Sequence, residues 1–148
     1  MDLDVPLLEV SLRTLERKSE ALADTLFASL LGERPELEAL FPADLEAHKR
    51  RFLIGLSTLI GSLRRPEKLE ACLDELSGRH AAAGVRPEHY ALFRRALLSA
   101  LREVTGPAWS PELAAAWGCA YDAVRDAMLE RDGDVPPRPR RWAALKTP

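Results

Sequence analysis

The chain has 148 residues, of which 47% are hydrophobic and 30% charged, and its formal net charge is −2. This length suits one domain with a substantial core, and the near-neutral charge excludes the overall basic field expected of a nucleic-acid-binding protein. No apolar run is long enough to cross a membrane, and the acidic start Met1-Asp2-Leu3-Asp4 lacks the basic and apolar parts of a signal peptide. We therefore expect a cytoplasmic protein without membrane or nucleic-acid partners.

The chain reads as all-α from one end to the other. Leu, Ala, Arg and Glu predominate, which are strong helix formers, and alternating strand patterns are absent. Apolar residues recur at helical spacing in successive segments separated by Pro and Gly. The pattern predicts helices over 5–18, 19–31, 45–63, 67–80, 87–104 and from 111 onwards, with a short helical turn over 35–41.

Several local signals mark the ends of these helices. Ser19 is a candidate N-cap for the second helix, and Gly32 is a candidate terminator. Pro35 and the triplet Ser110-Pro111-Glu112 are typical first-turn sequences. After His80, the Ala/Gly stretch 81–84 suggests a flexible link to a helix that Pro87 begins.

The composition changes near residue 133. Residues 133–148 are rich in Pro and Arg, which indicates a flexible tail, so we expect a folded domain over 1–132 and a solvated extension after it. The tail's basic run leaves open a contact with an acidic partner or a partner subunit. Cys72 and Cys119 are far apart, and in a cytosolic chain they are most simply reduced thiols, with a disulfide as the alternative.

Two of the three histidines lie where a metal could be held between helices. His48 stands early in its helix, with Arg51 and Phe52 one turn further on the same face. His80 lies near the end of a different helix, so the two imidazoles could approach one metal from opposite sides. Imidazole suits iron, and a haem iron needs an axial ligand. Alone, either histidine would be read as a surface or hydrogen-bonded residue, and His89 keeps that interpretation, facing water.

The order and spacing of these segments resemble the globin family, from about Leu7 to Arg131. Residues 46–53, Glu-Ala-His-Lys-Arg-Arg-Phe-Leu, resemble the distal helix, and 76–90 are similar to the proximal segment of bacterial single-domain haemoglobins. Residues 116–121, Ala-Trp-Gly-Cys-Ala-Tyr, are similar to the last helix of that group. The resemblance implies a globin fold, a three-over-three helical sandwich around haem b.

The resemblance also assigns roles around the haem. It implies that His80 is the iron ligand, that Leu76 and Val85 line the proximal side, and that Phe41 packs on the haem face. In bacterial members a tyrosine and a carboxylate hold the ligand histidine. Tyr90 matches the tyrosine, with plain core packing as the alternative, and the carboxylate falls near Asp132, with Glu130 as its neighbour.

The distal side departs from the bacterial pattern, in which a tyrosine and a glutamine are usual. Phe27 and His48 stand at those places, and with Arg51 they look more like neuroglobin. The resemblance then implies an apolar distal pocket, lined also by Phe52, with His48 as one strong donor. His48 could hydrogen-bond a gas ligand or bind the iron itself in a hexacoordinate resting state. Arg51 could reach a haem propionate or remain a solvated charge.

These features lead to three hypotheses about function. The first is a globin that reversibly binds or transports O2, CO and NO. The second is a haem enzyme, an NO dioxygenase, nitrite reductase or peroxidase-like protein, which would need an external reductase because the sequence contains no flavin or nicotinamide module. The third is a haem-based gas or redox sensor. A haem-free interaction or sensor module is a further alternative, against which His48, Phe41 and His80 all argue. A homodimer remains open.

Overall fold

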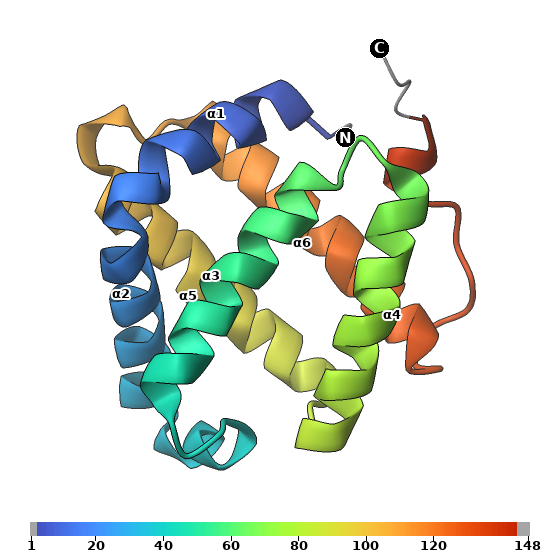
Figure 1. The fold of residues 1–148 in the computed structure, drawn as a ribbon, viewed down its shortest axis with the longest axis horizontal. Helices are drawn as coiled ribbons and strands as arrows, with labels where there is room; N and C mark the ends of the chain where they lie inside the picture. Colours follow the sequence, from blue (N-terminus) through green and yellow to red (C-terminus); the bar gives the residue numbers. More distant parts are fainter. Residues whose placement is uncertain (1–2, 145–148) are drawn as a thin grey trace.

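The computed structural model describes residues 3–144, and within them it contains helices and no strand, which confirms the all-α prediction. Six α-helices and four short 3-10 helices follow one another (Figure 1). Their bounds are α1 Val5–Leu15, η1 Glu16–Lys18, α2 Ser19–Glu33, η2 Pro35–Leu40, α3 Leu45–Gly61, α4 Pro66–Ala83, α5 Pro87–Thr105, η3 Gly106–Ala108, α6 Pro111–Arg131 and η4 Arg141–Ala144.

The helices form two layers of three. Helices α1, α3 and α4 lie across α2, α5 and α6, and in Figure 1 α3 and α4 run in front of α5 and α6. The contacts between layers join α1 to α6, α2 to α3 and α4 to α6, and the second layer is held together along α2, α5 and α6. This arrangement confirms the three-over-three sandwich that the resemblance implies.

The core lies between the layers and is continuous from α1 to the end of the described chain. Its largest fully buried side chains include Phe27, Leu101, Trp117 and Met128. The indole N–H of Trp117 donates to the Ser11 hydroxyl at 3.0 Å, so this buried polar pair is satisfied. Residues 52, 53, 56 and 59 of α3 are only half-buried, although their spacing predicts a buried face.

Several helix ends differ from the sequence prediction. Helix α2 begins at Ser19 itself, with Lys18 at the N-cap, and it continues through Gly32 to Glu33. Helix α4 extends three residues beyond His80, so the stretch expected to be flexible is helical until Gly84, which ends α4 with a left-handed φ of 83°. Ala is the strongest helix former, which explains why residues 81–83 extend the helix.

Other helix ends agree with the sequence. Pro35 begins η2, and the Ser110 hydroxyl accepts a hydrogen bond from the Leu113 N–H at 3.1 Å at the start of α6. Asp44 caps α3, because its carboxylate accepts from the Ala47 N–H at 3.0 Å. This cap fixes the first turn of α3, which is the turn that carries His48.

The segment after α6 departs from the expected solvated extension. Residues 132–140 form turns and irregular structure, yet the side chain of Trp142 in η4 is 1% exposed and belongs to the core. Arg140 forms ion pairs with both Glu70 and Glu130. The segment is therefore anchored at Arg140 and Trp142, whereas most of residues 133–139 are exposed, as expected of a solvated extension. Residues 145–148 lie outside the described part of the chain.

None of the helices described over residues 3–144 combines the length and apolar character needed to cross a membrane.

Candidate functional site

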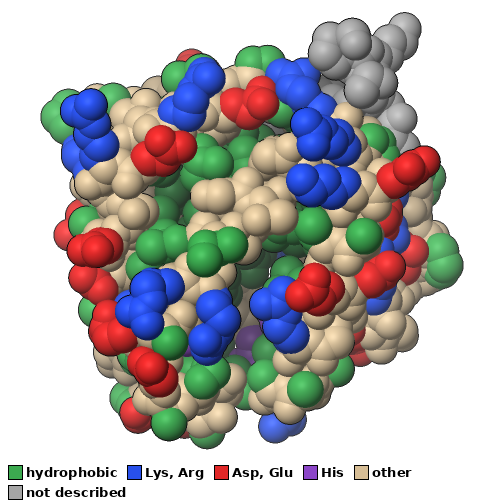
Figure 2. Space-filling view, viewed as in Figure 1, with side chains coloured by type: hydrophobic (Ala, Val, Ile, Leu, Met, Phe, Trp, Pro, Cys, Tyr) green, Lys and Arg blue, Asp and Glu red, His purple; other side chains and the backbone are tan. Residues whose placement is uncertain are grey.

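His48 on α3 and His80 on α4 lie near each other between the two helices. Figure 2 shows a hollow, here called the crevice, with a histidine side chain (purple) inside it and Lys and Arg side chains (blue) on both sides of its mouth. Both imidazoles are half-buried. They lie close enough to each other that the charge of His48 lowers the pKa of His80. The structure thus brings together the two histidines that the sequence singles out.

The wall around His48 is aromatic. The His48 ring lies 5.6 Å from the Phe27 ring and 5.1 Å from the Phe41 ring, centroid to centroid. Phe27 is fully buried and meets Phe41 and Phe52 edge-on at 5.3 and 5.7 Å. Edge-to-face packing of this kind is favourable for aromatic pairs. His48 is therefore the one polar side chain among these apolar rings.

The aromatic wall continues beyond Phe52 towards α6. Phe52 packs edge-on against Phe93 at 5.7 Å, and Phe93 stacks on Tyr121 at 6.3 Å. The Tyr121 hydroxyl donates to the backbone carbonyl of Tyr90 at 2.7 Å. Burial, followed by the nearby Tyr90, raises the pKa of Tyr121 well above its ordinary value, so this hydroxyl keeps its proton.

On the opposite wall, His80 belongs to a chain of hydrogen-bonding groups. Its Nδ1 lies 3.2 Å from the Tyr90 hydroxyl. Tyr90 in turn is hydrogen-bonded to Asp132, whose carboxylate also accepts the Ser77 hydroxyl at 3.1 Å. Because an ionised carboxylate can only accept, the Tyr90 hydroxyl donates its hydrogen bond to Asp132 and accepts one from the Nδ1–H of His80. This tautomer leaves Nε2 of His80 with a free lone pair.

The electrostatics keep both imidazoles neutral. Burial lowers the pKa of His48, and the neighbouring Arg51 guanidinium lowers it further. Burial also lowers the pKa of His80, against the opposing effect of Asp132. Burial and the carboxylate of Asp132 raise the pKa of Tyr90 well above 10, so the phenol remains protonated. Neutral imidazoles with an available nitrogen are the form that binds metals.

The remaining predicted residues belong to α3 and to the end of α4. Arg51 is exposed, close to His48, and no carboxylate within residues 3–144 forms an ion pair with it. Leu76 lies one helical turn before His80, and Val85 follows the end of α4; both are half-buried and pack against the core. His89 lies apart from this group, since its Nδ1 accepts the Arg86 backbone N–H at 2.9 Å.

These residues fit a haem. A planar apolar group with an iron at its centre needs apolar walls and an axial nitrogen, and its propionates need a cation at the edge. The aromatic rings supply the walls, and Nε2 of His80 is a suitable axial nitrogen. The exposed Arg51 next to His48, which forms no ion pair within residues 3–144, is a suitable cation. His48 is placed to face the other side of the same group.

Two neighbours of the site were not assigned to it by sequence pattern. Phe93 was predicted only as a core residue of α5, and Ser77 has no sequence signal beyond its position one turn before His80. For the carboxylate near the end of α6, the structure selects Asp132, whereas Glu130 faces Arg140 instead. The i, i+3 spacing of Ser77 and His80 is the signal that could have indicated a contact shared with α6.

Comparison with known proteins identifies what the chain resembles. A model of the Globin family matches residues 24–128. The flavohemoprotein of Deinococcus radiodurans is 30% identical over 126 residues, which cover 83% of this chain and 31% of that protein. The flavohemoprotein of Bordetella pertussis is 29% identical over 129 residues, covering 85% of this chain and 32% of its own length. The chain thus spans about a third of the length of these relatives.

A solved structure agrees with the sequence comparison. It is that of an engineered carbene transferase derived from a proposed nitric oxide dioxygenase of Rhodothermus marinus. It superimposes with a TM-score of 0.81 at 27% sequence identity, and the match covers 90% of this chain and 94% of the other.

Proposed function

The chain belongs to the globin family, and from this premise we propose that it binds haem b and reversibly binds O2, CO and NO. In this proposal His80 is the axial ligand, His48 lies on the gas side, and Arg51 binds a propionate. The observation that carries it is the pair of half-buried imidazoles on α3 and α4, which lie close enough to interact electrostatically and whose pKa values burial lowers. Bound there, haem supplies an iron with a coordination position for a diatomic gas and one-electron redox chemistry.

The chain's own residues have different roles on the proximal and distal sides. On the proximal side, the Tyr90 hydroxyl accepts a hydrogen bond from the Nδ1–H of His80 and donates one to the Asp132 carboxylate. These two hydrogen bonds hold the imidazole in one tautomer and increase its basicity. On the distal side, the rings of Phe27 and Phe41 exclude water and hold His48 in place. The His48 ring N–H is the donor available to a gas ligand, and its other nitrogen is the candidate sixth ligand at rest.

A second candidate is NO dioxygenase activity. The overall reaction joins NO and O2 to form nitrate and consumes an electron in each turnover, which an external reductase in the cytoplasm would supply. Two observations favour it: the relatives named flavohemoprotein, with the neighbour from a proposed nitric oxide dioxygenase, and the hydrogen-bonded chain of His80, Tyr90 and Asp132. Phe27 weighs against it, because no tyrosine hydroxyl faces the distal space.

The test is the visible spectrum of the haem-loaded ferrous protein, recorded before and after CO. Sharp, split bands before CO would indicate that His48 occupies the sixth position, whereas a broad five-coordinate band would indicate an open site. The His80→Ala variant should lose stable haem. The His48→Leu variant should keep haem, lose any six-coordinate spectrum and release oxygen faster.

Two outcomes would overturn the proposal. Purified protein that shows no Soret band after haem is supplied would exclude gas binding at an iron. A His80→Ala variant that keeps its haem with an unchanged spectrum would show that the ligand is another residue. NO consumption with a cellular reductase, sustained over many turnovers, would favour the dioxygenase.

A further inference from the structure

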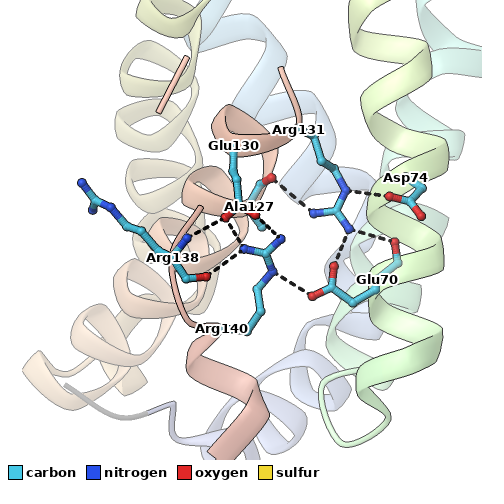
Figure 3. Close-up of polar contacts among 7 residues, drawn as sticks. All are labelled: Glu70, Asp74, Ala127, Glu130, Arg131, Arg138 and Arg140. Atoms are coloured by element: carbon cyan, nitrogen blue, oxygen red, sulfur yellow. Dashed lines mark hydrogen bonds and ion pairs between the residues drawn. The ribbon is translucent and has the colours of Figure 1, made fainter. Parts of the chain in front are cut away.

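The segment after α6 fastens α4 to α6 through a group of charged side chains. We call this group the clamp; Figure 3 shows its members, which are Glu70, Asp74, Glu130, Arg131 and Arg140. The Arg140 guanidinium lies between the two helices, with Nε 2.8 Å from Glu70 on α4 and Nη2 3.1 Å from Glu130 on α6. The tail therefore contributes the cation that joins the two acidic residues.

Arg131 makes the same connection from within α6. Its Nε lies 2.8 Å from the Asp74 carboxylate, and its Nη2 contacts both the carboxylate and the backbone carbonyl of Glu70. The side chains of Arg131 and Arg140 are only 15% and 20% exposed. Burial alone would raise the pKa of Glu70, yet the hydrogen bonds from these two guanidiniums outweigh it and lower the pKa. The carboxylate is thus fully ionised at neutral pH.

Two further contacts hold the tail in position. The Arg138 backbone N–H donates to Glu130 at 3.1 Å, and Trp142 is buried in the core. The Arg140 guanidinium lies over the Trp142 ring at 5.8 Å from its centre. The residues two positions before and after Arg140 are thus both attached to the fold, which fixes the position of Arg140 between the helices.

The clamp lies on the helix that carries the proximal histidine. Glu70, Asp74 and Ser77 follow one stripe of α4 at intervals of one turn, and all three contact residues at or beyond the end of α6. His80 is one further turn along, about 15 Å from Glu70 at 1.5 Å per residue. A straight helix moves as a unit, so a shift of α4 at Glu70 would also shift His80.

We propose that the clamp is a positioning device for the proximal helix, in which the C-terminal segment, through Arg140, sets where His80 stands relative to the crevice. This inference rests on the proposed function, because it takes His80 to be the iron ligand. Arg140 and Glu70 are positioning residues that act through α4. The segment predicted as a solvated extension thereby becomes part of the control of the iron ligand.

The test compares Arg140→Met with Arg138→Met in the haem-loaded full chain. Arg138 is the matched control, because Figure 3 shows its guanidinium directed away from the clamp and only its backbone takes part in it. Two quantities are measured: the rate of haem loss to excess apomyoglobin, and the iron–histidine stretching band by resonance Raman after photolysis of the CO complex. Far-UV circular dichroism checks that both variants are folded.

We expect Arg140→Met to lose haem about fivefold faster or more, which is the lower end of coupling between separate sites, and to shift the iron–histidine band. Arg138→Met should leave both unchanged. Glu70→Gln should reproduce the effect, and it replaces Arg140→Met if that variant does not fold. Combining Glu70→Gln with Arg140→Met should have less effect than the sum of the two single substitutions, since both remove the ion pair between Arg140 and Glu70.

The outcomes separate the clamp from the ligand assignment. A band that is present in the unmodified protein but identical in Arg140→Met, Glu70→Gln and Arg138→Met would overturn the clamp and leave His80 as the ligand. Absence of the band from the unmodified protein would overturn both the ligand assignment and the clamp.

Discussion

Replacing Tyr90 with phenylalanine tests the proximal hydrogen-bonded chain directly. The substitution keeps the buried ring but removes the hydroxyl that connects Nδ1 of His80, 3.2 Å away, with the Asp132 carboxylate. A hydrogen bond to a charged group contributes about 1.5–3 kcal/mol, so we expect the free energy of unfolding to fall by roughly 2 kcal/mol. For a chain of this length that corresponds to a fall in Tm of about 4–8 °C.

The matched control is Tyr121→Phe. The Tyr121 hydroxyl is also buried next to Tyr90, but it donates to a neutral backbone carbonyl at 2.7 Å and makes no contact with the imidazole. Its removal should cost about 1 kcal/mol. In the haem-loaded protein, only Tyr90→Phe should lower the frequency of the iron–histidine band, because only that hydroxyl increases the basicity of His80.

A double-mutant cycle with Asp132→Asn completes this experiment. If Tyr90 and Asp132 form one unit, their coupling energy should lie at about 0.5–3 kcal/mol, measured by urea unfolding. The reasoning would be refuted if Tyr90→Phe and Tyr121→Phe lowered stability equally, left the iron–histidine band unshifted and showed no coupling to Asp132.

Three other substitutions or conditions have defined outcomes. Trp142→Ala should lower the free energy of unfolding by about 3 kcal/mol, because it empties a buried site. Trp142→Phe should cost less than about 1 kcal/mol, because the buried indole N–H that it removes lacks a hydrogen-bond partner. Thermal melts measure both losses, and equal losses would contradict the prediction. Burial lowers the pKa of His48 and His80, so near pH 6.5 the unfolded apoprotein binds protons that the folded form does not. The free energy of unfolding, measured with urea, should therefore be greatest above that pH and decrease below it. In His48→Gln this decrease should be smaller. Phe27→Tyr should slow oxygen dissociation in stopped-flow measurements, since it adds a donor beside His48; an unchanged rate would indicate that the hydroxyl does not face the gas.

The sequence by itself determined the elements and the pair of imidazoles. Helical spacing of apolar residues and the Pro and Ser first-turn signals depend on interactions within a few residues, so they can be recognised from the sequence without knowledge of the fold. The same local reasoning placed His48 with Phe52 on one face and His80 on a separate helix. It was wrong at Gly32 and at residues 81–83, where neither glycine nor a short Ala run was enough to end the helix.

Only the tertiary structure decided which acid meets Tyr90. Asp132 and Glu130 are two residues apart near the end of α6, so they point in different directions, and the way that α6 crosses α4 and α5 determines which one meets Tyr90. Local pattern contains no information about that crossing. The structure brings Asp132 to Tyr90 and Ser77, and turns Glu130 towards Arg140.

Tertiary contacts also determine where the C-terminal segment lies. Its Pro and Arg content is typical of a solvated tail, because such residues do not form a helix or a core of their own. The core that buries Trp142 and the acidic residues that bind Arg140 are supplied by α4 and α6, which are distant in sequence. A segment with little structure of its own thus becomes ordered where the rest of the fold provides the apolar surface and the opposite charges.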